Sequence, residues 1–367
     1  KISRVGFAEN FSSSLAPCTR TMVARSRQKI FAASLHIFLN LVLNHYIMHR
    51  WFLFFTFLIT GYAMGDTVEY VQLNNGYKVW TKRVGHGPIK VLLLHGGPGC
   101  SAGYLEEPFQ AHCVQDEFEL IFYDQLGSRH SDQPHDLSLW TIERFREEVE
   151  EVRKGLQLED FYLYGQSWGG MLAIEYALKY QHHLKGLILS NTPGSITSYE
   201  YYVDQLRSQL PQSIQEQMQA FEDKGAYLEP DYQDFIFREL YTKHLCRCQP
   251  WPEIVHLTFQ NLNSEIYQEM QGPSEFTVTG NFKNWNRWED FSTIHVSTLV
   301  ISGRYDTINP EDTVKIASLI PQARAVICEQ GSHLSLYDDP ASYFEAIRPF
   351  LNLRTTSQSC AKADNHK

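Results

Sequence analysis

The hexapeptide GQSWGG at residues 165–170 constrains the fold of this chain more than any other segment. It follows the apolar run FYLY and opens the helical pattern MLAIEYALKY, so the sequence predicts a sharp turn from a strand into a helix. Such a turn lifts the hydroxyl of Ser167 out at the top of a sheet, and glycines beside it avoid side chains that would clash in a strained backbone. Ser167 is therefore a candidate nucleophile, the alternative being a purely structural turn.

From about Asp66 onward, predicted strands and helices alternate. Residues 68–73 and 77–83 are joined by Asn-Asn-Gly, which is typical of an antiparallel hairpin. The alternation that follows predicts an α/β fold with a mostly parallel central sheet and helices on both faces. The further expected strands are 89–94, 120–123, 161–164, 187–189, 298–301 and 325–328, and the expected helices are 142–156, 168–180, 310–318 and 341–351.

Residues 193–285 interrupt this alternation. They are rich in Gln, Glu, Tyr and Leu at helical spacing, so we expect a helical insertion, or cap, above the carboxyl ends of the strands. The core then comprises residues 64–192 and 286–354. The polar tail, residues 355–367, is expected to be disordered.

The first 63 residues differ from the rest in charge. They hold seven basic residues and a single acid, Glu9, whereas the whole chain has a formal net charge of −10. Three interpretations of this extension stay open: a signal peptide that starts at Met48, a membrane anchor on the apolar run 51–65, or a spurious extension of a protein that starts at Met64. We expect a cytoplasmic protein, with secretion as the alternative, and membrane contact only if the anchor is real.

Composition excludes several classes of protein. A hydrophobic fraction of 43% excludes a disordered chain, and the acidic balance argues against nucleic-acid binding. Seven cysteines are too few for a disulfide scaffold, and Cys246-Arg247-Cys248 lacks a second cysteine pair at metal-ligand spacing, so we expect no zinc site. We expect no cofactor, since no glycine-rich phosphate loop occurs. The oligomeric state is left open.

Two further residues complete a candidate triad with Ser167. Asp306, in GRYD, follows the apolar run TLVIS, and His333, in GSH, comes after the run AVICE. The order serine, acid, histidine and the positions after strands suit a general base, His333, oriented by Asp306. The alternative is that Asp306 caps the following helix and His333 is an ordinary loop histidine.

The segment HGGPG, residues 95–99, ends the first buried strand. Glycines at that position leave backbone N–H groups open to a developing oxyanion. We expect the N–H groups of Gly97 and Trp168 to form this oxyanion hole. A tight structural turn is the alternative.

These motifs together resemble the proline iminopeptidase family of α/β-hydrolase serine peptidases. The resemblance spans about residues 66–352 and rests on HGGPG, Asp124-Gln125, GQSWGG, GRYD and GSH, with HLCRCQPWP (244–252) and MQGPSEFTVTG (270–280) in the cap. It implies an α/β-hydrolase fold with a helical cap and a serine aminopeptidase. Such an enzyme releases an amino-terminal residue, preferably proline, from small peptides with a free amino terminus.

The resemblance also implies a role for Glu275, which matches a cap glutamate that binds the substrate ammonium; the alternative is a solvated cap residue. Tyr267 and Phe276 are candidates for the proline pocket. The family often has a second acid directly after the catalytic aspartate, but here that position is Thr307, and Arg129 replaces a loop glycine. These departures keep an amino-acid amidase or esterase open as the alternative function. A catalytically inactive binding module would predict a missing triad member, and none is missing.

Overall fold

A computed structural model describes residues 66–113 and 117–363 of the chain. The chain divides into two units, residues 1–64 and 65–367, and all described residues lie in the second. The interpretations of residues 1–63 therefore lie outside the described residues. Among the helices of the described part, none is both long and apolar enough to cross a membrane.

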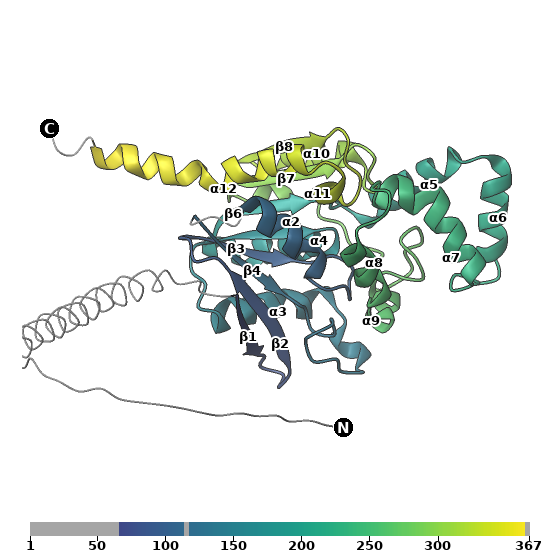
Figure 1. Ribbon diagram of the computed structural model, residues 1–367, viewed down its shortest axis with the longest axis horizontal. Coiled ribbons are helices and arrows are strands. Elements are labelled where there is room, and N and C mark those ends of the chain that lie inside the picture. Colours follow the sequence, from purple (N-terminus) through teal and green to yellow (C-terminus); the bar gives the residue numbers. More distant parts are fainter. Residues whose placement is uncertain (1–65, 114–116, 364–367) are drawn as a thin grey trace, which may run out of the picture. The chain divides into compact units, whose positions relative to one another are not determined.

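A single eight-stranded sheet forms the centre of the described unit (Figure 1), with the strand order β1-β2-β4-β3-β5-β6-β7-β8. The pairs β1–β2 and β2–β4 are antiparallel, and the remaining pairs are parallel. This topology confirms the predicted α/β fold. The strands are β1 (Thr67–Gln72), β2 (Lys78–Val84), β3 (Ile89–Leu94), β4 (Phe118–Tyr123), β5 (Phe161–Gln166), β6 (Leu184–Ser190), β7 (Thr298–Gly303) and β8 (Ala323–Cys328).

Helices cover both faces of the sheet because successive side chains of a buried strand point to opposite sides. On β3, Leu92 and Leu94 pack into the core under α3, α4 and α10, whereas Val91 and Leu93 pack into the core under α2 and α12. These helices and the short α11 are α2 (Gly103–Cys113), α3 (Ile142–Gly155), α4 (Trp168–Tyr180), α10 (Pro310–Leu319), α11 (Ser335–Asp338) and α12 (Pro340–Ala363), with short 3₁₀ turns η1 (Leu137–Leu139), η2 (Gln181–His183) and η4 (Phe291–Thr293).

The last helix is longer than the sequence predicts. We expected a helix over residues 341–351 and a disordered tail from Thr355, but α12 continues to Ala363. The first three turns of α12 pack against the sheet through Tyr343 and Ile347. Once a helix is nucleated, adding further residues costs little, so a packed first half favours helix in the polar residues that follow.

The insertion expected between two strands lies between β6 and β7. Residues 191–297, all of which the structure describes, contain helices and no strand of the sheet. Figure 1 shows α5, α6 and α7 standing to one side of the sheet, and α8 and α9 closer to it. The cap helices are α5 (Ile196–Ser208), α6 (Gln212–Glu222), α7 (Pro230–Ile236), the π-helical η3 (Phe237–Leu245), α8 (Glu253–Gln260) and α9 (Ser264–Met270).

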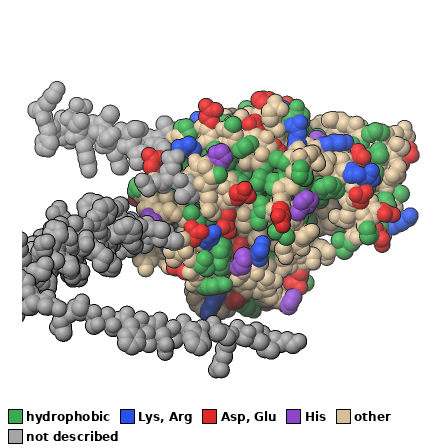
Figure 2. Space-filling model, in the orientation of Figure 1, with side chains coloured by type: hydrophobic (Ala, Val, Ile, Leu, Met, Phe, Trp, Pro, Cys, Tyr) green, Lys and Arg blue, Asp and Glu red, His purple; other side chains and the backbone are tan. Residues whose placement is uncertain are grey.

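The surface charge is mixed. On the face shown in Figure 2, Lys and Arg side chains are scattered among acidic ones instead of gathering into a basic patch. A nucleic-acid-binding face needs clustered positive charge.

Candidate active site

Ser167 sits at the turn between β5 and α4. Its backbone has φ +57° and ψ −123°, a sparsely populated region for a residue with a side chain. A Cβ on Gly165 would lie 2.1 Å from the carbonyl oxygen of Gly169, and one on Gly169 would lie 2.3 Å from that of Leu94. The glycines at these two positions therefore allow the turn to close, for the steric reason expected from the sequence.

Asp306 and His333 lie together at the neighbouring strand ends. Asp306 follows β7, His333 follows β8, and both side chains are buried. His333 Nδ1 donates to Asp306 Oδ1 at 2.7 Å. The helix after Asp306 is capped by Asn309, whose side chain accepts from the Glu311 N–H at 3.0 Å. The structure thus gives no support to a capping role for Asp306 at that helix.

The histidine is held in an environment that favours its protonated form. Burial by itself would lower the pKa of His333, but the charge of Asp306 and its hydrogen bond, together with the nearby Glu275, raise that pKa above its ordinary value of 6.5. The imidazolium formed when His333 takes a proton is therefore stabilised by Asp306.

Asn191 is a functional candidate that sequence reasoning missed. It directly follows β6, is fully buried, and has a positive φ of +50°. Its Nδ2 donates to Asp306 Oδ2 at 2.6 Å and to the carbonyl oxygen of Ser332 at 3.0 Å. The side-chain amide of Asn191 thus holds both the Asp306 carboxylate and the loop that carries His333. The only sequence signal is a polar residue directly after the apolar run of β6.

The candidate oxyanion hole lies beside Ser167. Gly97 has φ +119°, and a Cβ there would lie 2.8 Å from two backbone nitrogens, so only glycine fits. Trp168 is the first residue of α4, where backbone N–H groups lack partners within the helix. Gly97 and Ser167 line the same cavity.

A buried hydrogen-bond network joins the loop after β3 to the start of α4. The Trp168 indole donates to Gln125 Oε1 at 2.8 Å, and Gln125 Nε2 donates to the carbonyl oxygen of His95 at 3.0 Å. The Gln125 N–H donates to His95 Nε2 at 3.1 Å, so the imidazole proton is on Nδ1, which donates to the Gly96 carbonyl oxygen. Burial lowers the pKa of His95, in keeping with this neutral form. The network holds Gly96 and Gly97 against the nucleophile turn.

A cavity of about 400 Å³ lies over Ser167, between the sheet and the cap. Gly97, Gln166, Ser167 and His333 contribute to its floor. Its cap side is largely aromatic and is formed by Phe237, Tyr241, Trp251, Phe259 and Tyr267. Of the two aromatic residues expected in a proline pocket, Tyr267 lines this cavity. Phe276 lines a different one, described below.

Glu275 brings a carboxylate from the cap to the same cavity as Ser167 and His333. Tyr267 donates to Oε2 at 3.1 Å, and the Tyr199 hydroxyl contacts both Oε1, at 3.1 Å, and the carbonyl oxygen of Glu275. Burial raises the pKa of Glu275 above its usual range, opposed by His333 and by the two tyrosine hydrogen bonds. Glu275 is thus a half-buried carboxylate that two tyrosines hold at the cavity, and a cation beside it would favour its charged form.

Thr307, where the resemblance leads one to expect a second acid, is fully buried. Its hydroxyl lies 3.4 Å from Asp306 Oδ1 and 3.3 Å from His333 Nδ1. Thr307 therefore contacts Asp306 and His333 and does not line the cavity. The carboxylate that lines the cavity together with Ser167 is that of Glu275.

The cap is tied to the loop that carries the histidine. The N–H of His333 donates to the carbonyl oxygen of His244 at 2.9 Å, and the N–H of Leu334 donates to that of Leu245 at 2.8 Å. His244 and Leu245 of η3 thus form backbone hydrogen bonds with this loop, and contacts from both the cap and the core position His333.

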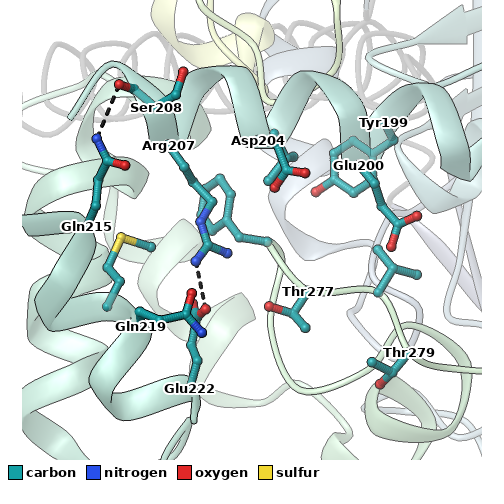
Figure 3. Close-up of a pocket in the computed structure, with 14 residues that line it drawn as sticks. Tyr199, Glu200, Asp204, Arg207, Ser208, Gln215, Gln219, Glu222, Thr277 and Thr279 are labelled. Atoms are coloured by element: carbon teal, nitrogen blue, oxygen red, sulfur yellow. Dashed lines mark hydrogen bonds and ion pairs between the residues drawn. The ribbon is translucent and has the colours of Figure 1, made fainter. Parts of the chain in front are cut away.

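A second cavity, of about 700 Å³, lies within the cap between α5, α6 and residues 276–279 (Figure 3). Figure 3 shows Arg207 paired with Glu222, at 2.6 Å, across this cavity. Tyr199 lines this cavity as well, while its hydroxyl reaches Glu275. None of the three candidate triad residues is among the described residues that line it.

Comparisons with known proteins agree with this geometry. The family model for the alpha/beta hydrolase fold matches residues 90–340. The proline iminopeptidase of Flavobacterium johnsoniae is 42% identical over 280 residues, which cover 75% of this chain and 94% of that protein. The proline iminopeptidase of Saccharolobus solfataricus is 36% identical over 304 residues, which cover 80% of this chain and 94% of that protein.

Solved structures give a similar result. The crystal structure of VinJ superposes with a TM-score of 0.73 at 30% identity, covering 78% of this chain and 98% of that one. The crystal structure of the proline iminopeptidase of Mycobacterium smegmatis also superposes with a TM-score of 0.73, at 26% identity, covering 80% of this chain and all of that one.

Proposed function

Because the chain belongs to the proline iminopeptidase family of α/β hydrolases, we propose that it is a serine aminopeptidase that releases amino-terminal proline from peptides. One observation carries the proposal: the carboxylate of Glu275 and the candidate nucleophile Ser167 line one cavity of about 400 Å³. A cavity of that size accommodates a small ligand such as the amino-terminal end of a peptide, and the carboxylate provides a partner for a free amino terminus.

In the first step, Ser167 Oγ attacks the carbonyl carbon of the amino-terminal residue while His333 takes the hydroxyl proton. Asp306, 2.7 Å from His333 Nδ1, holds the tautomer that leaves Nε2 free to accept. The tetrahedral intermediate collapses when His333 gives the proton to the leaving amine. The shortened peptide departs, and the first residue stays as an ester on Ser167.

The carbonyl oxygen becomes an oxyanion in that intermediate, and the N–H groups of Gly97 and Trp168 stabilise it. Removing one such donor typically raises the barrier by about 3 kcal/mol. Water then attacks the ester under general-base catalysis by His333, and the free amino acid is released. This chemistry uses no metal or cofactor.

The ammonium of the substrate pairs with Glu275, which Tyr199 and Tyr267 hold in place. A charged hydrogen bond of this kind contributes about 1.5–3 kcal/mol, so a peptide with a blocked amine binds and reacts less well. The aromatic cap wall, which includes Tyr267 and Trp251, provides an apolar surface for the pyrrolidine ring.

An amino-acid amidase or esterase is the second candidate function. It is favoured by Thr307, which puts a hydroxyl where a second acid would otherwise add negative charge near the triad. With Glu275 alone as the carboxylate among the described lining residues, a free amine on the substrate matters less than it would in a site with two acids. Small amides or esters then become substrates.

The test compares proline β-naphthylamide with its amino-blocked analogue, the alanine and leucine naphthylamides, and a short-chain nitrophenyl ester. Rapid cleavage of the free proline amide, with little cleavage of the blocked analogue, is expected of the aminopeptidase. Ester cleavage without any dependence on a free amine would instead identify the amidase or esterase. Ser167→Ala should abolish turnover of every substrate, and activity retained in it would overturn the nucleophile assignment.

Glu275→Gln tests the ammonium site. We expect kcat/KM for the free proline amide to fall by about 10- to 100-fold, which corresponds to losing one charged hydrogen bond, while ester cleavage is unchanged. Glu265→Gln is the matched control, because Glu265 is a cap carboxylate that accepts from the Trp140 indole outside the cavity. Equal losses on amide and ester would mean that Glu275 supports the fold instead.

A further inference from the structure

Two cysteines and an aspartate converge at the junction of cap and core. Cys246 and Cys248 follow η3, and Asp338 ends α11. Their two sulfurs and a carboxylate oxygen all lie within 4.8 Å of one another. Cys246 is buried and the other two are half-buried, so the group is open to solvent on one side. None of the three lines the cavity over Ser167.

The distances between these atoms suit a tetrahedral metal. Asp338 Oδ1 lies 3.6 Å from Cys246 Sγ and 3.5 Å from Cys248 Sγ. In a tetrahedral Zn²⁺ site with metal–sulfur bonds of about 2.3 Å and a metal–oxygen bond of about 2.0 Å, sulfur and oxygen ligands are separated by about 3.5 Å. Both sulfur–oxygen distances therefore match such a site, and the two sulfurs lie within 4.8 Å of each other.

The carboxylate is held in position by groups that a cation would not displace. The Arg247 N–H donates to Asp338 Oδ1 at 2.8 Å, and the Ser332 N–H donates to Oδ2 at 2.9 Å. Both sulfurs lie within hydrogen-bond distance of the same Oδ1, and Cys248 Sγ also lies 3.5 Å from the carbonyl oxygen of Tyr337. A cation between the three atoms replaces those two thiol protons and leaves the backbone contacts as they are.

We propose that Cys246, Cys248 and Asp338 form a binding site for a soft divalent cation of the Zn²⁺ and Cd²⁺ class. Two thiol protons pass to solvent as two metal–sulfur bonds form, and no electron is transferred. Thiolate ligands select such cations over Mg²⁺ or Ca²⁺, which prefer oxygen. Solvent completes the coordination, because the described residues supply three ligands here.

This assignment differs from the expectation that Cys246-Arg247-Cys248 binds no zinc. That expectation rested on the lack of a second cysteine pair. The third ligand is an aspartate 90 residues further on, which only the fold brings to the cysteines.

A bound cation would join the cap to the loop of the catalytic histidine. Asp338 supports the N–H of Ser332, which precedes His333, and Leu245, which precedes Cys246, accepts from the N–H of Leu334. The site therefore acts on stability and not on substrate contacts, and binding should raise the melting temperature of the folded chain.

The test titrates the full chain, kept reduced with a phosphine, with Cd²⁺. We expect the ultraviolet thiolate-to-cadmium charge-transfer band to saturate at one equivalent, Zn²⁺ to displace the band, and Tm to rise with either cation. Cys248→Ala should lose the band and the Tm rise. Cys113→Ala, which removes a buried thiol of α2 that does not belong to this group, should keep both. Asp338→Asn should weaken cadmium binding with both thiols still present.

Three results would overturn the proposal. The first is no charge-transfer band while a thiol assay shows Cys246 and Cys248 reduced. The second is a band of equal strength in Cys248→Ala. The third is a band lost equally in Cys113→Ala. Catalytic activity does not enter the readout, so the result stands apart from the proposed peptidase function.

Discussion

Replacing Asn191 tests whether orientation of the acid limits catalysis. Asn191→Gly is the cleanest change, because the native φ of +50° suits glycine and the backbone N–H bond to Ile301 is retained. The variant removes the 2.6 Å hydrogen bond to Asp306 Oδ2. Among the described residues, Asn191 is the side chain that donates to that oxygen, while Oδ1 also accepts from the Ile308 N–H.

The magnitude follows from the type of bond. A hydrogen bond to a buried carboxylate contributes about 1.5–3 kcal/mol, and losing it lets Asp306 turn away from His333. His333 carries a positive charge in the transition state, so losing this bond raises the activation barrier by the same energy. The value of kcat then falls by about 10- to 100-fold. KM should hardly change, because Asn191 does not line the substrate cavity.

The assay is steady-state hydrolysis of the proline amide, with Tm measured on the same samples. Thr313→Val is the matched control, because it removes a buried hydrogen bond of 2.8 Å to Ser302 without touching the acid. It should lower Tm and leave kcat intact. A kcat for Asn191→Gly within about twofold of the parent, or a loss confined to KM, would refute the positioning role.

Two further predictions concern pH and the nucleophile turn. The pKa of His333 is raised above 6.5, and only the neutral ring can accept a proton, so kcat/KM should rise with pH through a midpoint above 6.5. The stability that this group contributes is full below pH 6.5 and is lost as the pH rises through the pKa of the folded state. A midpoint of the rate profile below 6.5 would contradict this prediction. Gly165→Ala should destabilise the fold by about 3 kcal/mol or more, because the new Cβ lies 2.1 Å from a backbone oxygen. Gly225→Ala, with φ +65° and open space, should cost only about 1 kcal/mol, so equal losses of Tm in the two variants would disprove the steric argument.

The sequence was sufficient to predict features that depend on neighbouring residues. Strand β3 and helix α4 have the expected bounds, because an apolar run and a helical pattern each end at glycines or polar residues. The positions of Ser167, Asp306 and His333 after their strands also follow from local patterns. In parallel sheets those strand ends meet at one edge, which is why residues 27 apart, Asp306 and His333, come into contact.

Features that depend on distant contacts could not be predicted in this way. Nothing near Glu275 in the sequence indicates that Tyr199 and Tyr267 hold it, and nothing near Cys248 indicates Asp338. The contacts of Glu275 depend on how the cap folds on itself, and the contact of Cys248 with Asp338 depends on how the cap packs against the core. The length of α12 was missed for a related reason, because its polar second half follows a packed first half.

The two backbone hydrogen bonds from the histidine loop to η3 bear on how substrate enters and leaves. If the cap swung open as one body, it would break the bonds to His244 and Leu245, and the general base would lose its support in every cycle. We infer that this part of the cap stays in place during turnover, so that substrate enters and products leave past cap segments that do not bond to the histidine loop. The proposed triad beneath the cap can then stay assembled while a peptide enters or leaves.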